Sequence, residues 1–324
     1  MEMIRPVYDP IRGRMRVVAL ASGSGNTLWK AHDLQLRLEE TFEGSPFEVV
    51  AVFSDNPESK ALITAIERHI PCLGIDIRDF YAQRGKPLKD RKVRAEYDTL
   101  IMDFFEEHQP DVVLLAGYVW ATTDTIIENL PVINVHPADL SIKRDGKRLY
   151  AGANGVGAAL GDGAAQLRSS SHIATSVLDS GPVLVISPPV AVDPEDGLEG
   201  QERMKYYLKQ VNDQSREVGA RTIYEVALGK FGMDEKGTVF YRGRPCPDGM
   251  KFESWDHCRP LYDRETDKLL KPESVAVIGA SSKPGLGNAV LKNVLDFGFP
   301  GKVFAVNRKG EDVLGVKGYG SVRE

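Results

Sequence analysis

Short apolar runs alternate with amphipathic stretches from residue 15 onward. Continuous apolar runs of about four to eight residues predict buried strands, and apolar positions roughly three or four apart predict helices. In the first part of the chain the predicted strands are 16–21, 48–54, 72–75 and 111–116, and the predicted helices are 28–42, 59–69 and 93–107. This alternation is typical of an α/β fold with a doubly wound, mostly parallel sheet, whose ligands bind beyond the carboxyl ends of the strands.

The pattern changes in the second part of the chain. Residues 133–192 are rich in strand-like runs, and 198–228 have the apolar spacing of a long helix. Residues 232–271 contain Gly, Pro and many charges, which predicts a connector with a hairpin around 238–242. A second strand, glycine-rich loop and helix begin at Ser274, and another strand follows at 302–307. We therefore predict a first domain over 1–231, a connector over 232–271 and part of a second domain over 272–324.

Length, charge and cysteine content narrow the class of protein. The 324 residues suit about two domains. Lys and Arg number 41 and Asp and Glu 46, so the net charge of −5 argues against a nucleic-acid-binding protein. The longest apolar run, Val112–Trp120, is too short to cross a membrane, and Met1–Met15 lacks the apolar segment of a secretory signal. The cysteines, Cys72, Cys246 and Cys258, form no close pair, so we expect a reducing, cytoplasmic location and no metal site.

Three polar side chains stand at the ends of apolar runs. Asn134 and His136 lie in one predicted strand, where alternation places them on the same face, and Asp179 lies in a Leu-Asp-Ser-Gly-Pro turn. An amide and a protonated imidazole can donate to an oxyanion, and a carboxylate can raise the proton affinity of the imidazole and accept a proton from an attacking amine. Each residue alone also fits a structural role, as a histidine bonded within its strand or an aspartate in a turn.

The combination of four segments resembles a known family. Residues 18–27, 110–117, 134–137 and 178–182 occur in the order found in the folate-dependent formyltransferases, and most resemble phosphoribosylglycinamide formyltransferase. The resemblance covers roughly residues 15–230. It implies a Rossmann-like domain that uses 10-formyltetrahydrofolate as co-substrate. It also implies that Asn134, His136 and Asp179 are catalytic and that His172 supports them.

The same resemblance implies two binding regions. The loop 22–27 corresponds to the loop that holds the substrate phosphate, so Gly25, Asn26 and Thr27 are the expected anion-binding residues. Glycines allow close approach of the backbone, and amides at a helix start favour an anion, although a turn without a ligand has the same pattern. The expected folate-binding residues are Leu115, Gly117, Tyr118, Val119 and Trp120. The rings of Tyr118 and Trp120 suit either stacking on a pterin or a place in the core.

The chain departs from the family pattern after the catalytic histidine. Residues 137–148 contain a basic run, Lys143, Arg144, Lys147 and Arg148, and the interval from Asn134 to Asp179 is several residues longer than usual in the family. These changes flank the amine side of the site, so the acceptor need not be the purine intermediate. The basic run fits a solvated loop, or a grip on an anionic acceptor.

The last segment resembles a different family. Residues 271–287, 298–307 and 315–322 are similar to the start of the CoA-binding domain of NDP-forming acyl-CoA synthetases. The resemblance implies that Gly279, Ser281, Ser282 and Lys283 contact CoA, although a dinucleotide-type turn has a similar pattern. We expect this module to be truncated, with CoA affinity that appears only when the remainder of a longer fusion chain is present.

These observations together predict an enzyme. It would transfer a formyl group from 10-formyltetrahydrofolate to a small amine or phosphorylated substrate, without nucleic acid or membrane as partner. One alternative is hydrolysis of the same donor, as in the deformylases, which need nearly the same triad but usually carry a regulatory domain ahead of the catalytic one. Another is a non-catalytic ligand-binding module attached to a CoA ligase.

Overall fold

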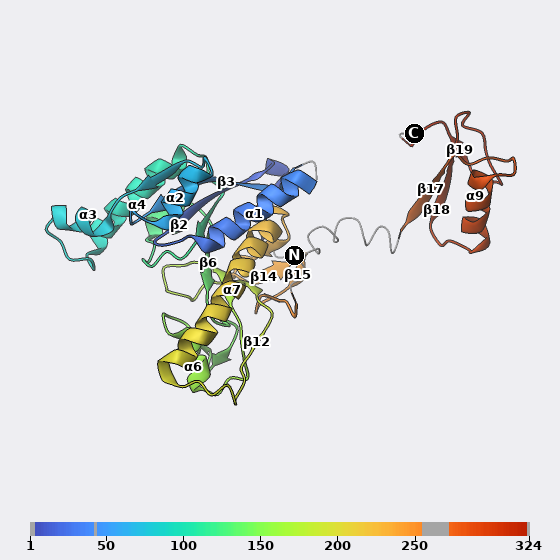
Figure 1. Cartoon of the computed structure of the whole chain (residues 1–324). Helices are drawn as coiled ribbons and strands as arrows, with labels where there is room; N and C mark the ends of the chain where they lie inside the picture. Colours follow the sequence, from blue (N-terminus) through green and yellow to red (C-terminus); the bar gives the residue numbers. More distant parts are fainter. Residues whose placement is uncertain (1–3, 42–43, 255–271, 323–324) are drawn as a thin grey trace. The chain divides into compact units, whose positions relative to one another are not determined.

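The computed structural model describes residues 4–41, 44–254 and 272–322 (Figure 1). The chain divides into two compact units, Met1–Ser254 and Trp255–Glu324. Phe42, at the end of a predicted helix, lies outside the described residues, as do Cys258 and the rest of 255–271 in the predicted connector.

An eight-stranded sheet forms the centre of the first unit, in the order β16-β11-β10-β6-β5-β2-β3-β4. Its strands are β2 (Met15–Ala21), β3 (Phe47–Ser54), β4 (Cys72–Gly74), β5 (Val112–Leu115), β6 (Val132–His136), β10 (Ser170–Ile173), β11 (Val183–Ile186) and β16 (Met250–Lys251). Strands β4, β3, β2, β5 and β6 are parallel, whereas β10 is antiparallel to both β6 and β11. The prediction of an α/β fold with a mostly parallel sheet is confirmed.

The strand order reverses at β2, because β3 lies on one side of it and β5 on the other. The loops that follow β2 and β5 therefore lead away in opposite directions. Such a reversal leaves a crevice at the carboxyl ends of the strands, where ligands of open α/β sheets bind.

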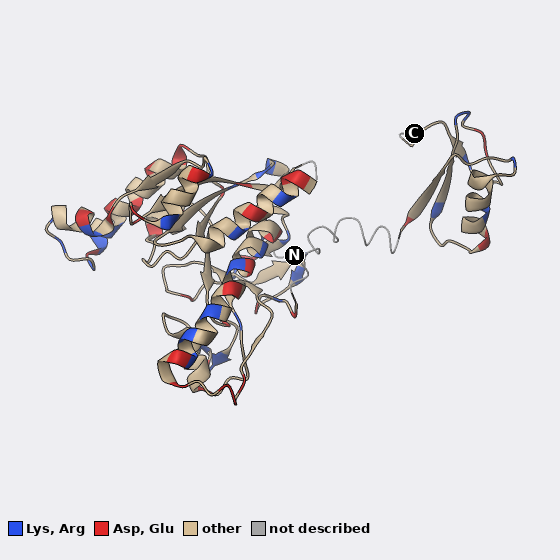
Figure 2. Ribbon diagram, in the orientation of Figure 1, with Lys and Arg blue, Asp and Glu red and all other residues tan. Residues whose placement is uncertain are grey.

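The helices of the first unit are the short 3-10 helix η1 (Pro10–Arg12) and α1 (Asn26–Thr41), α2 (Lys60–Glu67), α3 (Ile77–Gln83), α4 (Arg91–Glu106), α5 (Asp124–Ile127), α6 (Gly155–Gly161) and α7 (Gly200–Ala227). Four of them, α1, α2, α4 and α7, lie near their predicted positions, whereas the sequence did not predict η1, α3, α5 and α6. Ser59, Asp76 and Asp90 begin α2, α3 and α4 by accepting hydrogen bonds from amides of the first turn. Helix α7 runs alongside α1 (Figure 1), and acidic and basic residues are interspersed along both helices (Figure 2).

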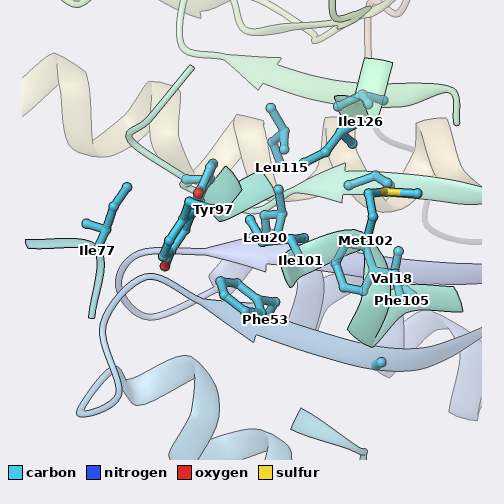
Figure 3. Packing of buried hydrophobic residues seen from close by; sticks show 14 of the residues in the cluster. Val18, Leu20, Phe53, Ile77, Tyr97, Ile101, Met102, Phe105, Leu115 and Ile126 are labelled. Atoms are coloured by element: carbon cyan, nitrogen blue, oxygen red, sulfur yellow. The ribbon is translucent and has the colours of Figure 1, made fainter. Parts of the chain in front are cut away.

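A large apolar cluster fills the space between α4 and one face of the sheet (Figure 3). Tyr97, Ile101 and Phe105 are four residues apart on α4 and are fully buried, so this face of the helix covers Leu20 and Leu115 of the parallel strands. Because β2 is covered on both faces, almost all its residues are apolar, and this makes it easy to recognise in the sequence.

Residues after α7 add strands to the first unit, although their composition indicated a connector. β13 (Phe231–Met233), β14 (Val239–Tyr241) and β15 (Arg244–Pro245) form a small sheet with β1 (Arg5–Pro6), and β16 extends the central sheet. Phe231, Val239 and Phe252 are buried and hold this segment in place. The remaining short strands are β7 (Lys143–Arg144) with β8 (Lys147–Arg148) and β9 (Gln166–Leu167) with β12 (Val190–Ala191).

The second unit is a small parallel sheet with one helix. It consists of β17 (Ser274–Ile278), α9 (Leu286–Asp296), β18 (Lys302–Val306) and β19 (Gly318–Tyr319), in the sheet order β17-β18-β19. Across the described parts of both units, no helix has the length and apolar character needed to span a bilayer.

Candidate active site

Strand pairing brings the predicted catalytic residues together. Asn134 and His136 lie on β6, and His172 lies directly opposite Asn134 on β10. Asp179 lies in the turn between β10 and β11, where its φ is +50°, in the left-handed region that residues other than glycine rarely adopt. The turn folds back so that the carboxylate of Asp179 reaches both histidines.

The four side chains form one connected cluster. Oδ2 of Asp179 lies 3.5 Å from Nδ1 of His136, and Oδ1 lies 3.5 Å from Nε2 of His172. Nδ2 of Asn134 lies 3.1 Å from the same Nε2 of His172. All but Asn134 are buried, so the charges of this cluster are poorly shielded by water.

The hydrogen-bond partners give the two histidines different roles. Nδ1 of His172 lies 3.0 Å from the carbonyl of Ile173, which can only accept, so this nitrogen carries a proton, while Nε2 faces both Asn134 and Asp179. Nε2 of His136 lies 2.8 Å from the carbonyl of Tyr150, so that nitrogen carries the proton, while Nδ1 faces Asp179. Two acceptors on opposite sides of the His136 ring suit a protonated imidazole.

Burial and hydrogen bonding act in opposite directions on these groups. For Asp179, burial acts to raise the pKa, but the hydrogen bond from His172, the charge of His136 and the amide of Gly152 together lower the pKa to about 2. For His136, burial is the largest influence and holds the pKa below its usual value, although the nearby carboxylate of Asp179 acts to raise it. Asp179 is therefore ionised at neutral pH and available to accept a proton.

A cavity of about 450 Å³ opens onto this cluster. Its lining residues are Arg91, Leu115, Tyr118, Val119, Trp120, Ala121, Thr122, Asn134, His172, Ala174, Thr175, Ser176, Val177, Leu178 and Asp179. The side chains of Val119 and Leu178 are 75% and 68% exposed, so the lining includes apolar groups open to solvent. His136 is not among the described residues that line the cavity. It contacts Asp179 from outside the cavity. A cavity that combines apolar walls with convergent polar groups is typical of a small-molecule site.

Four of the five predicted folate-binding residues, Leu115, Tyr118, Val119 and Trp120, line this cavity. Gly117, with φ of +75°, makes the turn before Tyr118. The Tyr118 ring is part of the apolar core, and Nε1 of Trp120 donates to Oδ2 of Asp55 at 2.7 Å. The two rings are thus held by the protein as well as facing the cavity.

Two charged residues behind the cavity wall were not among the predicted site residues. Arg94 and Asp98, one turn apart on α4, form a buried ion pair with 3.1 Å between Nε and Oδ1. Arg94 also donates to the hydroxyl of Tyr118 at 2.9 Å, and the amide of Thr123 donates to Asp98 at 2.7 Å. The signal in the sequence was an Arg and an Asp on the apolar face of an otherwise amphipathic helix.

The predicted anion-binding loop joins β2 to α1. Gly25 has φ of +63°, and a Cβ there would lie 3.1 Å from Cβ of Ala61 and 3.3 Å from Nε1 of Trp29, so only glycine fits well. Nε1 of Trp29 donates to the carbonyl of Ser24 at 2.9 Å, which holds the loop closed around the start of α1. Asn26 is exposed and Thr27 half-buried at this helix start, where amides suit an anion.

The basic run is divided in the structure. Lys143 and Arg144 on β7 are exposed, as is Lys147, whereas Arg148 turns inward and is half-buried beside Asp179. Lys143 lies 3.7 Å from Asp248, an exposed pair that contributes little stability. In the described parts of the chain, no group of three or more His, Cys, Asp or Glu side chains is arranged to hold a metal ion.

The second unit places its predicted CoA loop between β17 and α9. Gly279 has φ of +82°, and a Cβ on Gly287 would lie 1.9 Å from the carbonyl oxygen of Gly279, so the helix start packs closely on the loop. Oγ of Ser281 accepts from the amide of Lys283 at 3.1 Å, and Ser282 and Lys283 are exposed. Close packing of a glycine-rich loop on a helix start is the arrangement that phosphate groups require.

Comparison with known proteins defines the class. The formyl transferase family matches residues 15–211, more than half of the chain, and the protein belongs to this family. A CoA binding domain family matches residues 273–324. Both resemblances inferred from the sequence are confirmed.

Individual relatives agree with these assignments. Phosphoribosylglycinamide formyltransferase of Mycobacterium tuberculosis (strain H37Rv) is 27% identical over 205 residues, which cover 63% of this chain and 84% of the relative. The structure of phosphoribosylglycinamide formyltransferase from Coxiella burnetii has the same fold, with a TM-score of 0.58 and 21% identity over 74% of this chain and 99% of that chain.

The second unit is similar to part of a CoA ligase. The alpha subunit of ADP-forming acetate–CoA ligase I from Pyrococcus furiosus is 50% identical over 48 residues, which cover 14% of this chain. The chain spans about a tenth of the length of that subunit, and also about a tenth of a matching trans-feruloyl-CoA synthase.

Proposed function

We propose that the first unit transfers a formyl group from 10-formyltetrahydrofolate to an amine. The observation that carries this proposal is the convergence of Asn134, His172 and Asp179 on one cavity that also has apolar walls. The cavity suits the pterin end of a folate, because it offers apolar walls and the rings of Tyr118 and Trp120. Membership of the formyl transferase family supports the reaction type.

The reaction begins with attack of the amine on the formyl carbon. Nδ2 of Asn134 donates to the developing oxyanion, while its other contact to His172 holds the amide in the orientation that makes donation possible. Asp179 accepts the proton that the attacking nitrogen loses, since it is ionised at neutral pH. The carbon–nitrogen bond to the folate then breaks, and the leaving nitrogen takes up a proton.

His136 contributes through Asp179 and through the oxyanion. Its ring lies against the carboxylate, so a proton that His136 takes up during the reaction would be stabilised by the ionised Asp179. For His136 to donate to the oxyanion as well, its hydrogen bond to the carbonyl of Tyr150 has to be exchanged for one to the substrate. Gly25, Asn26 and Thr27 would bind an anionic group of the acceptor at the start of α1, and Leu115, Gly117 and Val119 would contact the folate.

The test is incubation with 10-formyltetrahydrofolate, with and without candidate amines, while tetrahydrofolate release and the formylated product are measured. Release that depends on an amine, with formyl recovered on that amine, supports transfer. Release as formate without an amine identifies hydrolysis instead. No release under either condition would contradict both and favour a ligand-binding role. The Asp179→Asn variant is the matched control for contaminating activity.

A second function is supported by the match of residues 273–324 to a CoA binding domain. We propose that Gly279, Ser281, Ser282 and Lys283 hold the phosphates of CoA, with the ammonium of Lys283 as the charged contact. Calorimetric titration of CoA tests this, both in this chain and in a longer chain that contains the rest of a CoA-binding domain, where we expect the affinity to appear. Heat of binding in the longer chain that Lys283→Ala reduces supports the assignment, and the same heat with and without the substitution contradicts it.

A further inference from the structure

Arg148 is held against the turn that carries Asp179. Its guanidinium donates from Nη1 to the carbonyl of Asp179 and from Nη2 to the carbonyl of Gly181, the latter at 2.7 Å. This planar, two-pronged contact spans the turn at both ends, a geometry that the single ammonium of a lysine cannot reproduce. The residue before it, Lys147, is exposed, so the hairpin turns inward at Arg148.

The turn is one that needs support. Asp179 has φ of +50°, where side-chain-bearing residues are uncommon, and a Cβ on Gly181 would lie 1.8 Å from the carbonyl oxygen of Ile173. The backbone is therefore constrained at both residues whose carbonyls accept from Arg148, at Asp179 by its positive φ and at Gly181 by the lack of room for a side chain. Arg148 bonds to the two carbonyls that border this constrained segment.

The same segment also contacts the side chains of the cluster. The amide of Gly152 donates to Oδ2 of Asp179 at 2.7 Å, and the carbonyl of Tyr150 accepts from Nε2 of His136 at 2.8 Å. Residues 148–152 thus contact the backbone of Asp179, its carboxylate and His136. They begin with the last residue of the basic hairpin, in the region where the sequence departs from the pattern of the formyltransferases.

We propose that Arg148 is a positioning residue, which holds the 179–181 turn so that the carboxylate of Asp179 is aimed at His136 and His172. Among the described residues, Arg148 does not line the cavity. It therefore acts through Asp179 and does not touch the folate. The proposal rests on the proposed formyl transfer only for its kinetic test. The effect of the Arg148 charge on His136 can be measured without any reaction.

The charge of Arg148 supplies an independent measurement. The charged or titratable groups that face His136 are Asp179, His172 and Arg148. Burial lowers the pKa of His136 most, Asp179 raises it, and both His172 and Arg148 lower it further. Replacing Arg148 with a neutral residue should therefore raise the pKa of His136, whereas replacing it with lysine should leave that pKa nearly unchanged.

The experiment compares Arg148→Met and Arg148→Lys in the full chain. The pKa of His136 is read from an NMR titration of its ring protons, assigned with His136→Gln. We expect Arg148→Met to raise that pKa and Arg148→Lys to preserve it. We expect both variants to lower kcat, by up to about 100-fold, because a small displacement of a catalytic group is costly. KM for the folate should stay unchanged.

Arg16→Met is the matched control. Arg16 is also half-buried, and it also donates to a main-chain carbonyl, that of His108 at 3.0 Å. It lies at the amino-terminal end of β2, whereas the candidate site lies beyond the carboxyl ends of the strands. It should change neither the titration of His136 nor kcat. If Arg148→Met does not fold, Arg148→Lys decides the matter: a lowered kcat with an unchanged titration supports positioning.

Two results would overturn the proposal. One is an Arg148→Met protein with the titration and kcat of the wild type. The other is full recovery of kcat by Arg148→Lys, since charge alone would then suffice. If the wild type shows no formyl transfer, the proposed function is wrong. An unaltered titration of His136 in Arg148→Met would separately contradict the role proposed for Arg148.

Discussion

Two regions of the protein have the same local design and different surroundings. In the first unit, β2 leads through Gly25 into α1; in the second, β17 leads through Gly279 into α9. Both glycines adopt positive φ, +63° and +82°. Yet all of β2 except Arg16 is buried, whereas only Val277 is buried in β17. Helix α1 buries six residues, and α9 buries only Leu291.

The number of neighbouring elements accounts for this difference. Strand β2 lies between β3 and β5 in a sheet of eight strands, whereas β17 is the edge strand of a sheet of three. Ile278, at the end of β17, is 73% exposed. A strand–glycine loop–helix pattern therefore specifies a local unit, while the stability of that unit depends on what packs around it.

The largest expected effect is on the proposed formyl transfer, because the catalytic residues belong to the first unit alone. Asp179→Asn removes the proton acceptor and keeps the shape of the side chain, so turnover should fall by about 100-fold or more. The melting temperature of the second unit should not change. Steady-state kinetics and calorimetric melting of the same preparations check both statements. Turnover within a factor of about two of the wild type would exclude Asp179 from the mechanism.

Leucines that are fully buried in each region provide the next comparison. Leu20 on β2 belongs to a large apolar cluster and Leu291 on α9 to a small one. We expect Leu20→Ala to cost about 3–5 kcal/mol, and Leu291→Ala about 2 kcal/mol, because a small, open cluster can collapse around the cavity. Urea unfolding, followed separately for each unit, measures both losses. Equal losses would show that the two cores are equally rigid.

Crowded glycines test how tightly each helix packs. A Cβ on Gly287 would meet the carbonyl oxygen of Gly279 at 1.9 Å, and one on Gly219 of α7 would meet Cγ2 of Thr27 at 2.1 Å. A backbone oxygen cannot move aside as easily as a methyl group. Gly287→Ala should therefore destabilise the second unit by about 1–3 kcal/mol, with a smaller loss in the first unit for Gly219→Ala. Calorimetric melting of both variants measures the two losses, and a larger loss for Gly219→Ala than for Gly287→Ala would contradict this prediction.

The smallest expected effect is on stability in acid. The folded pKa of Asp179, about 2, lies below the value of about 3.9 for an unfolded aspartate. Its contribution to stability is therefore complete above about pH 4 and is lost as the pH falls toward 2. The melting temperatures of the wild type and Asp179→Asn should converge over this interval, with the second unit as internal reference. A difference that stays constant between pH 5 and 2 would contradict the lowered pKa.

Much of the fold could be predicted because its signals are local. The buried parallel strands appear as continuous apolar runs, and α4 shows its buried face as apolar residues four positions apart. The strands between 231 and 251 were harder to recognise, because they are two or three residues long and contain Gly, Pro and charged residues. Their burial depends on a few anchors, such as Phe231 and Phe252, that resemble isolated apolar residues of a loop.

The candidate site could be predicted in part. Strand alternation by itself placed Asn134 and His136 on one strand face, and the turn residues after Asp179 predicted a reversal of the chain. Which hydrogen bonds these groups make was decided only by the tertiary structure. The carbonyl of Tyr150, the amide of Gly152 and the guanidinium of Arg148 reach the cluster from another segment. Such contacts depend on the path of the backbone between distant residues, and the hydrophobic periodicity of the sequence does not predict that path.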